Sequence, residues 1–243
     1  MLHEFSRTEL LVGAEGMARL RGAHVAVFGV GGVGSFACEA IARAGVGAIT
    51  LIDSDTVSVT NRNRQLIALA STVGRNKVDV MRDRIADINP DCRVTALNMF
   101  FTPESGLDLT QFDYVIDAID TVTAKLFLIE QCYQRNIPII CSMGTGNKLD
   151  PTKFEVTDIS KTHGCPLAKV IRLECKKRGV KKLRVVFSPE PPVQIPPERY
   201  EAAAGDAKGT AGRPVPASIS FVPPVAGFIL AGEVIKDLAG ISR

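Results

Sequence analysis

Two cationic and two amide side chains gather in a polar stretch that follows an apolar run ending at residue 52. They are Asn61, Arg64, Gln65 and Lys77. Cations and amides grouped in this way favour binding of a triphosphate, and they stabilise the charge that builds up when its α-phosphate is attacked. Asp120 ends a later apolar run and could hold Mg²⁺, which prefers one or two carboxylates together with phosphate oxygens. Hydride transfer needs no such cations, so the pattern favours phosphate chemistry over oxidoreduction.

A glycine-rich turn stands before this stretch and indicates nucleotide binding. The first apolar run of the chain is followed by Gly29-Val-Gly31-Gly32-Val-Gly34. Gly29 permits the tight turn, Gly31 lets the backbone approach a pyrophosphate, and Gly34 lets the next helix pack on the strand. Asp53, about 20 residues further on, is placed to accept hydrogen bonds from ribose hydroxyls. NAD-, FAD- and ATP-using folds all share this unit, and the sequence contains no Walker P-loop motif.

Apolar runs that alternate with helical patterns predict the elements that must position these residues. We expect strands over residues 24–28, 49–52, 92–97, 112–120 and 137–141, with helices over 34–44, 74–88 and 121–135. One or two short leader helices over residues 4–20 should pack through Leu10, Leu11, Met17 and Leu20. This alternation implies an α/β fold with a doubly wound, Rossmann-like, mostly parallel sheet that binds ligands at the carboxyl ends of its strands. The glycine turn, Asp53 and Asp120 should therefore converge.

Residues 146–243 differ in composition and pattern from the preceding part of the chain. We expect a single domain, 1–243, in which residues 20–145 form the nucleotide-binding core and residues 146–243 form a C-terminal extension. For the extension we expect strands over 154–159, 183–187 and 218–222, and helices over 165–178 and 223–238. Residues 188–216 are rich in proline, glycine, alanine and charge, which predicts a mobile loop. The last helix is too apolar to remain in water, so it should pack on the sheet or on a second subunit.

Bulk properties set the class of protein. The chain has 243 residues, 46% apolar and 23% charged, which is ordinary for a soluble globule, and its formal net charge of +3 neither demands nor excludes nucleic acid. The six cysteines form no C-x-x-C pair, so neither a zinc ribbon nor a redox dithiol is indicated. We expect no signal peptide, no membrane span and a reduced, cytoplasmic setting.

Cys165 is the only one of the six cysteines that lies in a polar turn. A role as a thioester or persulfide nucleophile stays open, and an incidental loop cysteine is the preferred interpretation.

Six ordered motifs resemble the adenylation domain of the ubiquitin-activating-enzyme superfamily, the ThiF/MoeB-like proteins. They are Phe5-Ser-Arg7, Gly29-Val-Gly-Gly-Val-Gly34, Asp53-Ser-Asp55, Asn61-Arg-Asn-Arg64-Gln65, Gly74-Arg-Asn-Lys77 and Asp117-Ala-Ile-Asp120. The resemblance covers most of residues 4–145, with residues 218–227 resembling a returning strand and helix.

That resemblance implies adenylation of a carboxylate by Mg-ATP with release of pyrophosphate. It implies nucleotide contacts from these motifs, at Gly29, Gly31, Gly32, Gly34, Asp53, Asp55, Asn61, Arg64, Gln65 and Lys77. It assigns catalytic roles to Arg64, Lys77 and Asp120, with Asp120 beside the metal ion. It also implies a homodimer, in which Arg7 reaches the triphosphate of the other subunit.

Further segments, at residues 45–53, 59–61, 150–161 and 166–168, resemble the tRNA threonylcarbamoyladenosine dehydratases within that superfamily. This implies a ligase-type enzyme that uses ATP to activate the carboxylate of threonylcarbamoyladenosine beside the tRNA anticodon, after which a ring closes with net loss of water. Activators of small ubiquitin-like sulfur-carrier proteins usually carry two C-x-x-C pairs, which this sequence lacks. Such an activator is the alternative, and a sulfur-relay protein is left open as a further partner.

Basic residues concentrate in the second half of the chain and have two interpretations. They are Lys169, Arg172, Lys176, Lys177, Arg178, Lys181, Lys182 and Arg184. One interpretation is a solvated helix face, and the other is a track for tRNA phosphates with salt-sensitive binding.

Two more functional classes stay open for the whole protein. A nucleotide-sensing module would bind ATP without releasing AMP, and an oxidoreductase would bind a nicotinamide nucleotide in place of ATP.

Overall fold

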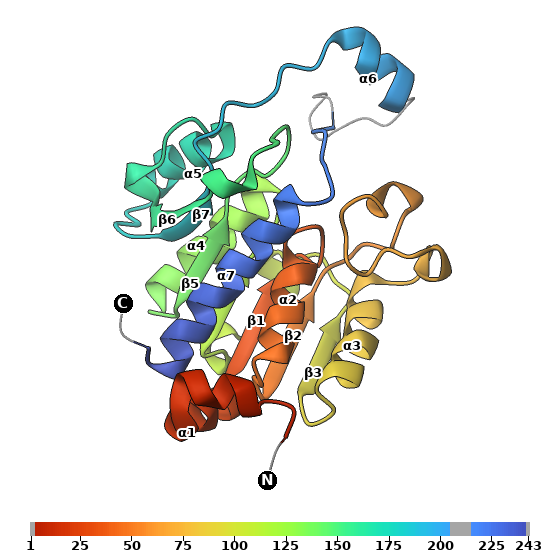
Figure 1. Cartoon of the computed structure of the whole chain (residues 1–243). Helices are drawn as coiled ribbons and strands as arrows, with labels where there is room; N and C mark the ends of the chain where they lie inside the picture. Colours follow the sequence, from red (N-terminus) through yellow and green to blue (C-terminus); the bar gives the residue numbers. More distant parts are fainter. Residues whose placement is uncertain (1–2, 205–214, 242–243) are drawn as a thin grey trace.

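The computed structural model describes residues 3–204 and 215–241, and its centre is one seven-stranded sheet (Figure 1). The strand order is β3-β2-β1-β4-β5-β7-β6. The strands are β1 (His24–Phe28), β2 (Ala48–Ile52), β3 (Arg93–Leu97), β4 (Tyr114–Asp117), β5 (Ile139–Ser142), β6 (Glu155–Asp158) and β7 (Arg184–Phe187). All neighbouring pairs are parallel except β6 with β7. The prediction of a doubly wound, mostly parallel α/β sheet is confirmed.

The described residues form seven α-helices, which cover both faces of this sheet except for α6, which stands away from it (Figure 1). They are α1 (Ser6–Gly22), α2 (Gly34–Arg43), α3 (Lys77–Ile88), α4 (Val122–Gln134), α5 (Pro166–Lys177), α6 (Pro197–Ala204) and α7 (Val222–Ala239). Figure 1 shows α7 lying beside α2 across one face, with α1 at the lower end of α7. The core on that face joins residues of α1, α2, α3 and α7 to the sheet, whereas α4 and α5 contribute to the cores of the other face.

The direction of winding reverses between β1 and β4. The chain passes outward from β1 to β2 and β3, then returns to the middle and passes outward through β4, β5 and β7. Such a reversal leaves a crevice at the carboxyl ends of the two central strands, which is where open α/β sheets bind their ligands. The glycine turn leaves β1 at this point.

The leader forms one helix with a kink, α1, and its packing differs in part from the prediction. Gly13 has non-helical backbone angles (φ 73°) in the middle of α1. Met17 and Leu20 are buried as predicted, but Leu10 and Leu11 are 87% and 86% exposed. The kink explains the difference, because residues before Gly13 no longer share a face with those after it.

The extension also departs from the sequence prediction in two places. Residues 197–204 form α6 inside the segment predicted as a loop, while residues 205–214 of that segment lie outside the described residues. Residues 218–222 do not form a strand, and Val222 already begins α7. Because β5 is paired with β4 and β7 on its two sides, no sheet edge is open to this segment there. Peptide groups of residues 217 and 218 bond to side chains instead: Asn63 Nδ2 donates to Ser218 O (3.1 Å) and Ala217 N donates to Asn147 Oδ1 (2.7 Å).

No helix within the described ranges, 3–204 and 215–241, is long and apolar enough to cross a membrane.

Candidate functional site

The glycine turn after β1 is the floor of the candidate site. Gly29 has φ 86°, and a Cβ atom there would lie 2.7 Å from Ala118 O. A Cβ atom on Gly34 would overlap Gly29 O, so both positions require glycine. At Gly31 the nearest atom to an added Cβ is Gln65 Nε2, at 3.7 Å. The protein itself therefore leaves room over Gly31, as expected of a position where the backbone approaches a phosphate.

Gly32 lies between two parts of the site that are far apart in sequence. A Cβ atom there would come within 3.2 Å of Pro223 Cβ and 3.3 Å of Arg64 Cγ. The start of α7 and the segment that carries Arg64 thus both pack against the turn. This brings the returning helix, predicted to resemble that of the family, to the edge of the crevice.

Asp53 follows β2 and is held by backbone amides. Its two oxygens accept hydrogen bonds from Val30 N (2.7 Å) and Asp55 N (2.8 Å), and its side chain is 9% exposed. Burial raises the pKa of Asp53, while the charge of Lys77 and the two amide hydrogen bonds oppose that shift. The carboxylate is thereby fixed beside the glycine turn, where the ribose of a nucleotide on this turn would lie.

Lys77 is the first residue of α3 and points back to the end of β2. Its ammonium forms an ion pair with Asp55 (2.6 Å) and lies 4.0 Å from Asp53 Oδ1. Its backbone N–H donates to Asp55 O (3.0 Å), so helix start and strand end are tied by both main chain and side chain. Lys77 is 5% exposed. A buried cation in this place is suited to bind an anionic ligand. Such a ligand would compete with the Asp55 carboxylate for the ammonium of Lys77.

The segment that carries Asn61, Arg64 and Gln65 folds tightly beside the turn. Asn61 ends a short 3-10 helix (Val59–Asn61), and its Oδ1 accepts from Ser58 N (3.1 Å). Arg64 Nη1 donates to Thr60 O (3.1 Å) and Asn63 Oδ1 (2.9 Å). These bonds hold the guanidinium close to the crevice.

Arg64 and Gln65 both leave capacity for a ligand. Burial lowers the pKa of the Arg64 guanidinium, and the charge of Asp120 opposes that shift, so the two side chains lie within electrostatic reach. Gln65 is buried, and its Oε1 has no hydrogen-bond partner among the described residues. A buried acceptor of this kind costs free energy unless a ligand or water satisfies it.

Asp120 follows β4 and is exposed at the same edge of the sheet. Thr121 Oγ1 lies 3.4 Å from one of its oxygens, and no cluster of three or more His, Cys, Asp or Glu side chains occurs in the described parts of the chain. A single free carboxylate near a phosphate site fits the way Mg²⁺ is usually held, by one or two carboxylates and the substrate's own phosphates.

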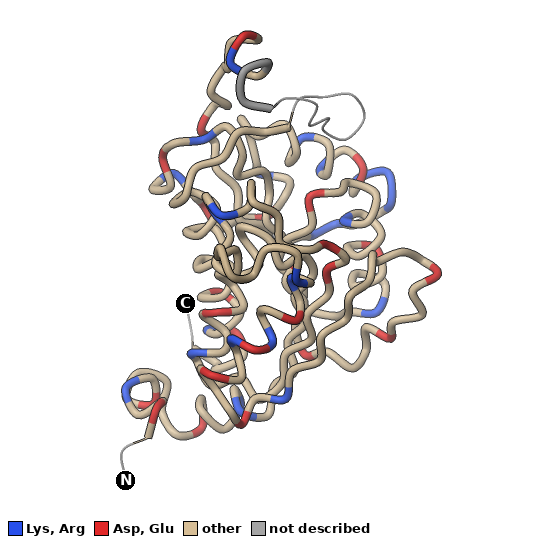
Figure 2. Tube along the Cα trace, turned by 90° about the vertical axis from the view of Figure 1, so that its right-hand side faces the viewer, with Lys and Arg blue, Asp and Glu red and all other residues tan. Residues whose placement is uncertain are grey.

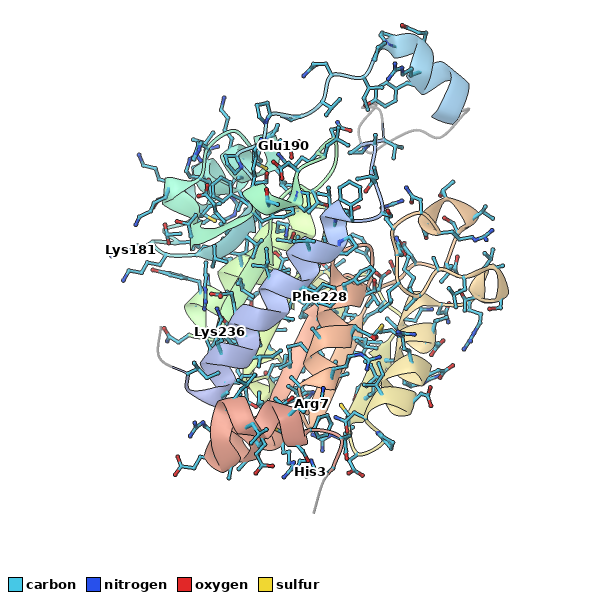
Figure 3. The ribbon with its side chains drawn as sticks, in the orientation of Figure 1. His3, Arg7, Lys181, Glu190, Phe228 and Lys236 are labelled. Atoms are coloured by element: carbon cyan, nitrogen blue, oxygen red, sulfur yellow. The ribbon has the colours of Figure 1, made fainter. Side chains whose placement is uncertain are left out.

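Arg7 is the one predicted site residue that the structure does not bring to this crevice. It is exposed on α1, which precedes β1 and so lies at the opposite end of that strand from the glycine turn (Figure 3). Within one chain Arg7 is therefore remote from the site. This position is compatible with its predicted action on a second subunit, which stays a prediction.

A buried ion pair below the site was missed by the sequence analysis. Lys125 Nζ and Asp117 Oδ2 are 2.7 Å apart, and both side chains are fully buried. Lys125 also donates to Ser142 O (3.0 Å), and Asp117 Oδ1 accepts from Ile119 N (3.0 Å). The pair joins β4, α4 and β5 under the loop that carries Asp120. A lone lysine within an apolar helical run was its only signal in the sequence.

A second buried lysine organises the loops of the extension. Lys148 is 4% exposed and donates to the carbonyl oxygens of Ser188 (3.3 Å) and Glu190. The Glu190 carboxylate in turn accepts from Leu149 N (2.9 Å) and Asp150 N (3.1 Å). We call this reciprocal arrangement the Lys148–Glu190 clamp.

Cys165, which the sequence places in a polar turn, is buried. It is 4% exposed, immediately before α5, and all six cysteines are free and buried. A Cβ atom on Gly144 would lie 3.6 Å from its sulfur. The packing favours the interpretation of a structural residue.

The structure therefore defines a doubly wound α/β protein with a glycine turn and converging cations at its switch point. A family model described as the ThiF family matches residues 5–243, and the chain belongs to the ThiF family. The tRNA threonylcarbamoyladenosine dehydratase of Bacillus subtilis (strain 168) is 53% identical over 242 residues, 98% of this chain and 95% of that protein.

Solved structures agree with this similarity. The Escherichia coli tRNA N6-threonylcarbamoyladenosine dehydratase TcdA in complex with ATP superposes with a TM-score of 0.84 at 38% identity, covering 98% of this chain and 94% of that one. Its complex with AMP gives a TM-score of 0.85. The molybdopterin-synthase adenylyltransferase of Salmonella typhimurium is more distant, 34% identical over 170 residues and 68% of each chain. The predicted superfamily and subfamily are both confirmed.

Proposed function

We propose that this protein is an ATP-dependent tRNA threonylcarbamoyladenosine dehydratase. It adenylates the carboxylate of threonylcarbamoyladenosine next to the anticodon and promotes closure of the ring. The observation that carries the proposal is the 53% identity, over nearly both full lengths, to the Bacillus subtilis enzyme of that name. The glycine turn and the cations at the switch point supply the chemistry such a reaction needs.

In the first step an oxygen of the carboxylate attacks the α-phosphorus of ATP, and pyrophosphate leaves with the electrons of the broken P–O bond. Negative charge grows on the phosphate oxygens in the transition state, and fixed cations stabilise it because they need no reorganisation. Arg64 and Lys77 are the cations in place, and Asn61 supplies an amide. The open backbone at Gly31 and the unsatisfied Gln65 Oε1 support a nucleotide in this position.

Three acidic side chains have separate proposed roles in binding the nucleotide. Asp53 accepts from the ribose, and Asp55 holds the ammonium of Lys77 at the site until phosphates compete for it. Asp120 would hold Mg²⁺ with the phosphate oxygens; the ion would neutralise part of the triphosphate charge. Gly29, Gly32 and Gly34 shape the turn.

In the second step the ureido group attacks the activated acyl carbon, and AMP leaves with one of the original carboxylate oxygens. The two steps together remove one water from the modified nucleoside. An intramolecular nucleophile needs positioning above all, so no enzyme cysteine is required. The burial of Cys165 is in keeping with this route and offers no support for docking of a sulfur-relay protein there.

The active assembly is proposed to be a homodimer. Arg7 is remote from the crevice of its own chain, so a second subunit is needed to bring it to a triphosphate. Leu10 and Leu11 on α1 are almost fully exposed, and Phe228, 48% exposed on α7, packs edge-on against Phe36 on the same face. These apolar side chains support a subunit contact across α1 and α7 (Figure 3).

The tRNA is proposed to contact the extension. Figure 2 shows basic and acidic residues interspersed along most of the trace, so the net charge does not by itself mark a face. Lys169 and Lys176 are exposed on α5, whereas Lys177 and the following Arg178 pair with Glu174 and Arg172 donates to Thr162 O (2.6 Å). The six free cysteines support a reduced, cytoplasmic setting.

The test is release of AMP and pyrophosphate with purified tRNA that carries threonylcarbamoyladenosine, against the same tRNA without it. We expect turnover only with the modified tRNA, and loss of one water mass from the nucleoside. Asp120→Ala should abolish both signals, whereas Asp91→Ala, at an exposed acid outside the crevice, should leave them intact. AMP release that ignores tRNA would contradict the proposal.

A second candidate is an activator of a small ubiquitin-like carrier protein, favoured by the 34% identity to the molybdopterin-synthase adenylyltransferase. It predicts AMP formation that depends on a carrier protein with a di-glycine carboxyl terminus. The same assay with such a carrier in place of tRNA separates the two.

A further inference from the structure

A groove of about 580 Å³ lies at the end of the sheet away from the glycine turn. It is bounded by the end of α4, by β6 and by the chain that leads into β7. Ile139 begins β5 and Arg184 begins β7, and both line the groove. Because β1, β4, β5 and β7 run parallel, the groove is at their amino ends and the candidate site is at their carboxyl ends. The groove therefore belongs to a separate part of the surface, which we call the α4–β6 groove.

The floor of the α4–β6 groove is apolar and its rim is not. The floor includes Ile129, Ile139, Val180 and Leu183. Tyr133, 37% exposed, stands at the rim on the last turn of α4. An aromatic ring above an apolar floor is a surface on which a flat, uncharged ring system can stack.

Two of the cations that line the groove are exposed lysines. Lys161 and Lys182 are exposed, and neither forms an ion pair with any described residue. The groove is also lined by one acid and one arginine. Asp158 accepts from Ser160 N (2.9 Å) and Leu183 N (3.0 Å) and interacts electrostatically with Lys161, and Arg184 is paired across to α7. Lys181 continues the basic rim at the outer edge of the molecule (Figure 3). Of the four charged side chains that line the groove, three are cations and one is an acid, so the lining carries more positive than negative charge.

We propose that the α4–β6 groove holds an unpaired nucleotide of the RNA substrate, with its base on Tyr133 and the apolar floor and its phosphates on Lys161 and Lys182. The inference rests on the proposed function. A stacking surface beside backbone-tracking cations is the way proteins bind single-stranded nucleic acid, and the volume is within the range of pockets that enclose a molecule of nucleotide size. A folded tRNA is long enough to reach both ends of the sheet.

The distance from the crevice decides which kinetic quantity the groove controls. A contact remote from the reacting atoms binds the substrate and the transition state equally, so its loss raises KM and leaves kcat unchanged. The groove is therefore an anchor for tRNA and no part of the adenylation chemistry. ATP affinity should not depend on it.

Titration of fluorescent tRNA with the full chain at several salt concentrations tests the proposal. Tyr133→Ala should weaken binding by about 5-fold to 100-fold, the usual range for loss of one stacked base, and Tyr133→Phe should retain the wild-type affinity. The double variant Lys161→Ala/Lys182→Ala should lower the slope of log K against log salt by about 1.4, or about 0.7 for each phosphate contact. Arg93→Ala, an exposed cation on β3 at the opposite edge of the sheet, is the matched control and should change neither quantity.

Each outcome bears on one proposal or the other. If the wild type binds and turns over modified tRNA while the groove variants keep its affinity, KM and salt slope, the groove inference is overturned and the proposed function stands. If the variants lose kcat at saturating tRNA, the groove is coupled to the chemistry and the anchor is refuted. If the wild type neither binds nor turns over modified tRNA, the proposed function itself fails.

Discussion

Two regions of the molecule, the nucleotide end and the C-terminal extension, are held together by hydrogen bonds that span different lengths of sequence. At the nucleotide end, several bonds join close neighbours in sequence, as when Asp53 accepts from Asp55 N and Arg64 donates to Thr60 O. The longer bonds there, from Val30 N to Asp53 and from Lys77 to Asp55, span 23 and 22 residues. In the extension, bonds reach further: 40 residues between Lys148 and Ser188, and 70 between Asn147 and Ala217. The first region is a set of local motifs placed on a sheet, and the second exists only when distant segments meet.

This difference predicts whether a mutation in each region should change turnover or local stability. A local motif keeps its shape when a ligand-facing side chain is removed, so the loss should appear in turnover. The Lys148–Glu190 clamp holds loops together and is not proposed to contact a ligand, so removing a member should appear in local stability. Asn63 joins the two regions, because it bonds both Arg64 and Ser218 O.

The largest effect should follow Arg64→Ala. The variant removes a cation proposed to face the phosphates while its neighbours hold the loop, so AMP release should fall by about 100-fold or more. Arg62→Ala changes an exposed cation two residues away and should leave the rate within about 2-fold, the scatter of neutral surface changes. Equal losses in both variants would mean that loop folding, not phosphate contact, is what Arg64 supplies.

The next effect concerns the buried pair beneath the site. Lys125→Met leaves Asp117 buried without its partner, which should lower the free energy of unfolding by about 3–5 kcal/mol. Lys177→Met removes a lysine that is 71% exposed from its pair with Glu174, and should cost about 0–0.5 kcal/mol. Urea titration of both variants measures the contrast. A cost below about 1 kcal/mol for Lys125→Met would show that water reaches the pair.

The contrast between regions also explains what the sequence could predict. The glycine turn, Asp53 and the helix α3 were predictable because strand, turn and helix signals act over a few residues, although α3 begins at Lys77 and not at the predicted Gly74. The five strands up to β5 follow from short apolar runs for the same reason. The class of site could then be derived from Arg64 and Lys77, because the topology brings the carboxyl ends of neighbouring strands together.

Other features depend on contacts that no local pattern records. The partner of Lys125 is set by how α4 lies on β4, and the position of residues 218–222 is set by a sheet edge that β7 already occupies. Leu10 and Leu11 fit a helical stripe, but the kink at Gly13 turns them outward. In the first two cases the missing information was tertiary, and in the third it was the backbone conformation of Gly13.

Lys148→Met should have an intermediate and local effect. It leaves the buried carbonyl oxygens of Ser188 and Glu190 without a donor, at a cost of about 1–3 kcal/mol. Amide hydrogen exchange should accelerate at Leu149 and Val193, whose N–H groups are bonded within these loops, while ATP affinity stays unchanged. Lys153→Met, at an exposed neighbour, is the control. A large loss of ATP affinity would mean that the clamp and the nucleotide end form one cooperative unit.

The smallest effect should come from Glu39, which ties α2 to α3 in the framework of the nucleotide end. Its carboxylate accepts from Arg84 (2.6 and 2.9 Å) and Arg43 (2.7 Å). Burial disfavours its charged form, but the hydrogen bonds of the two arginines prevail and the pKa of Glu39 lies below its ordinary value of 4.5. The folded protein therefore binds this proton less readily than the unfolded chain does. The stabilisation is fully present above 4.5 and is lost as the pH falls through the lowered pKa.

Glu39→Gln should accordingly cost about 1 kcal/mol at neutral pH, because partly exposed arginines limit the worth of the pair. The difference in unfolding free energy between wild type and variant should shrink toward zero below the lowered pKa, where the wild-type carboxyl is also neutral. Glu155→Gln, at an exposed carboxyl on β6, should show no such convergence. A difference that stayed constant through the acid range would mean that Glu39 acts by packing, and that the framework under the nucleotide end owes nothing to its charge.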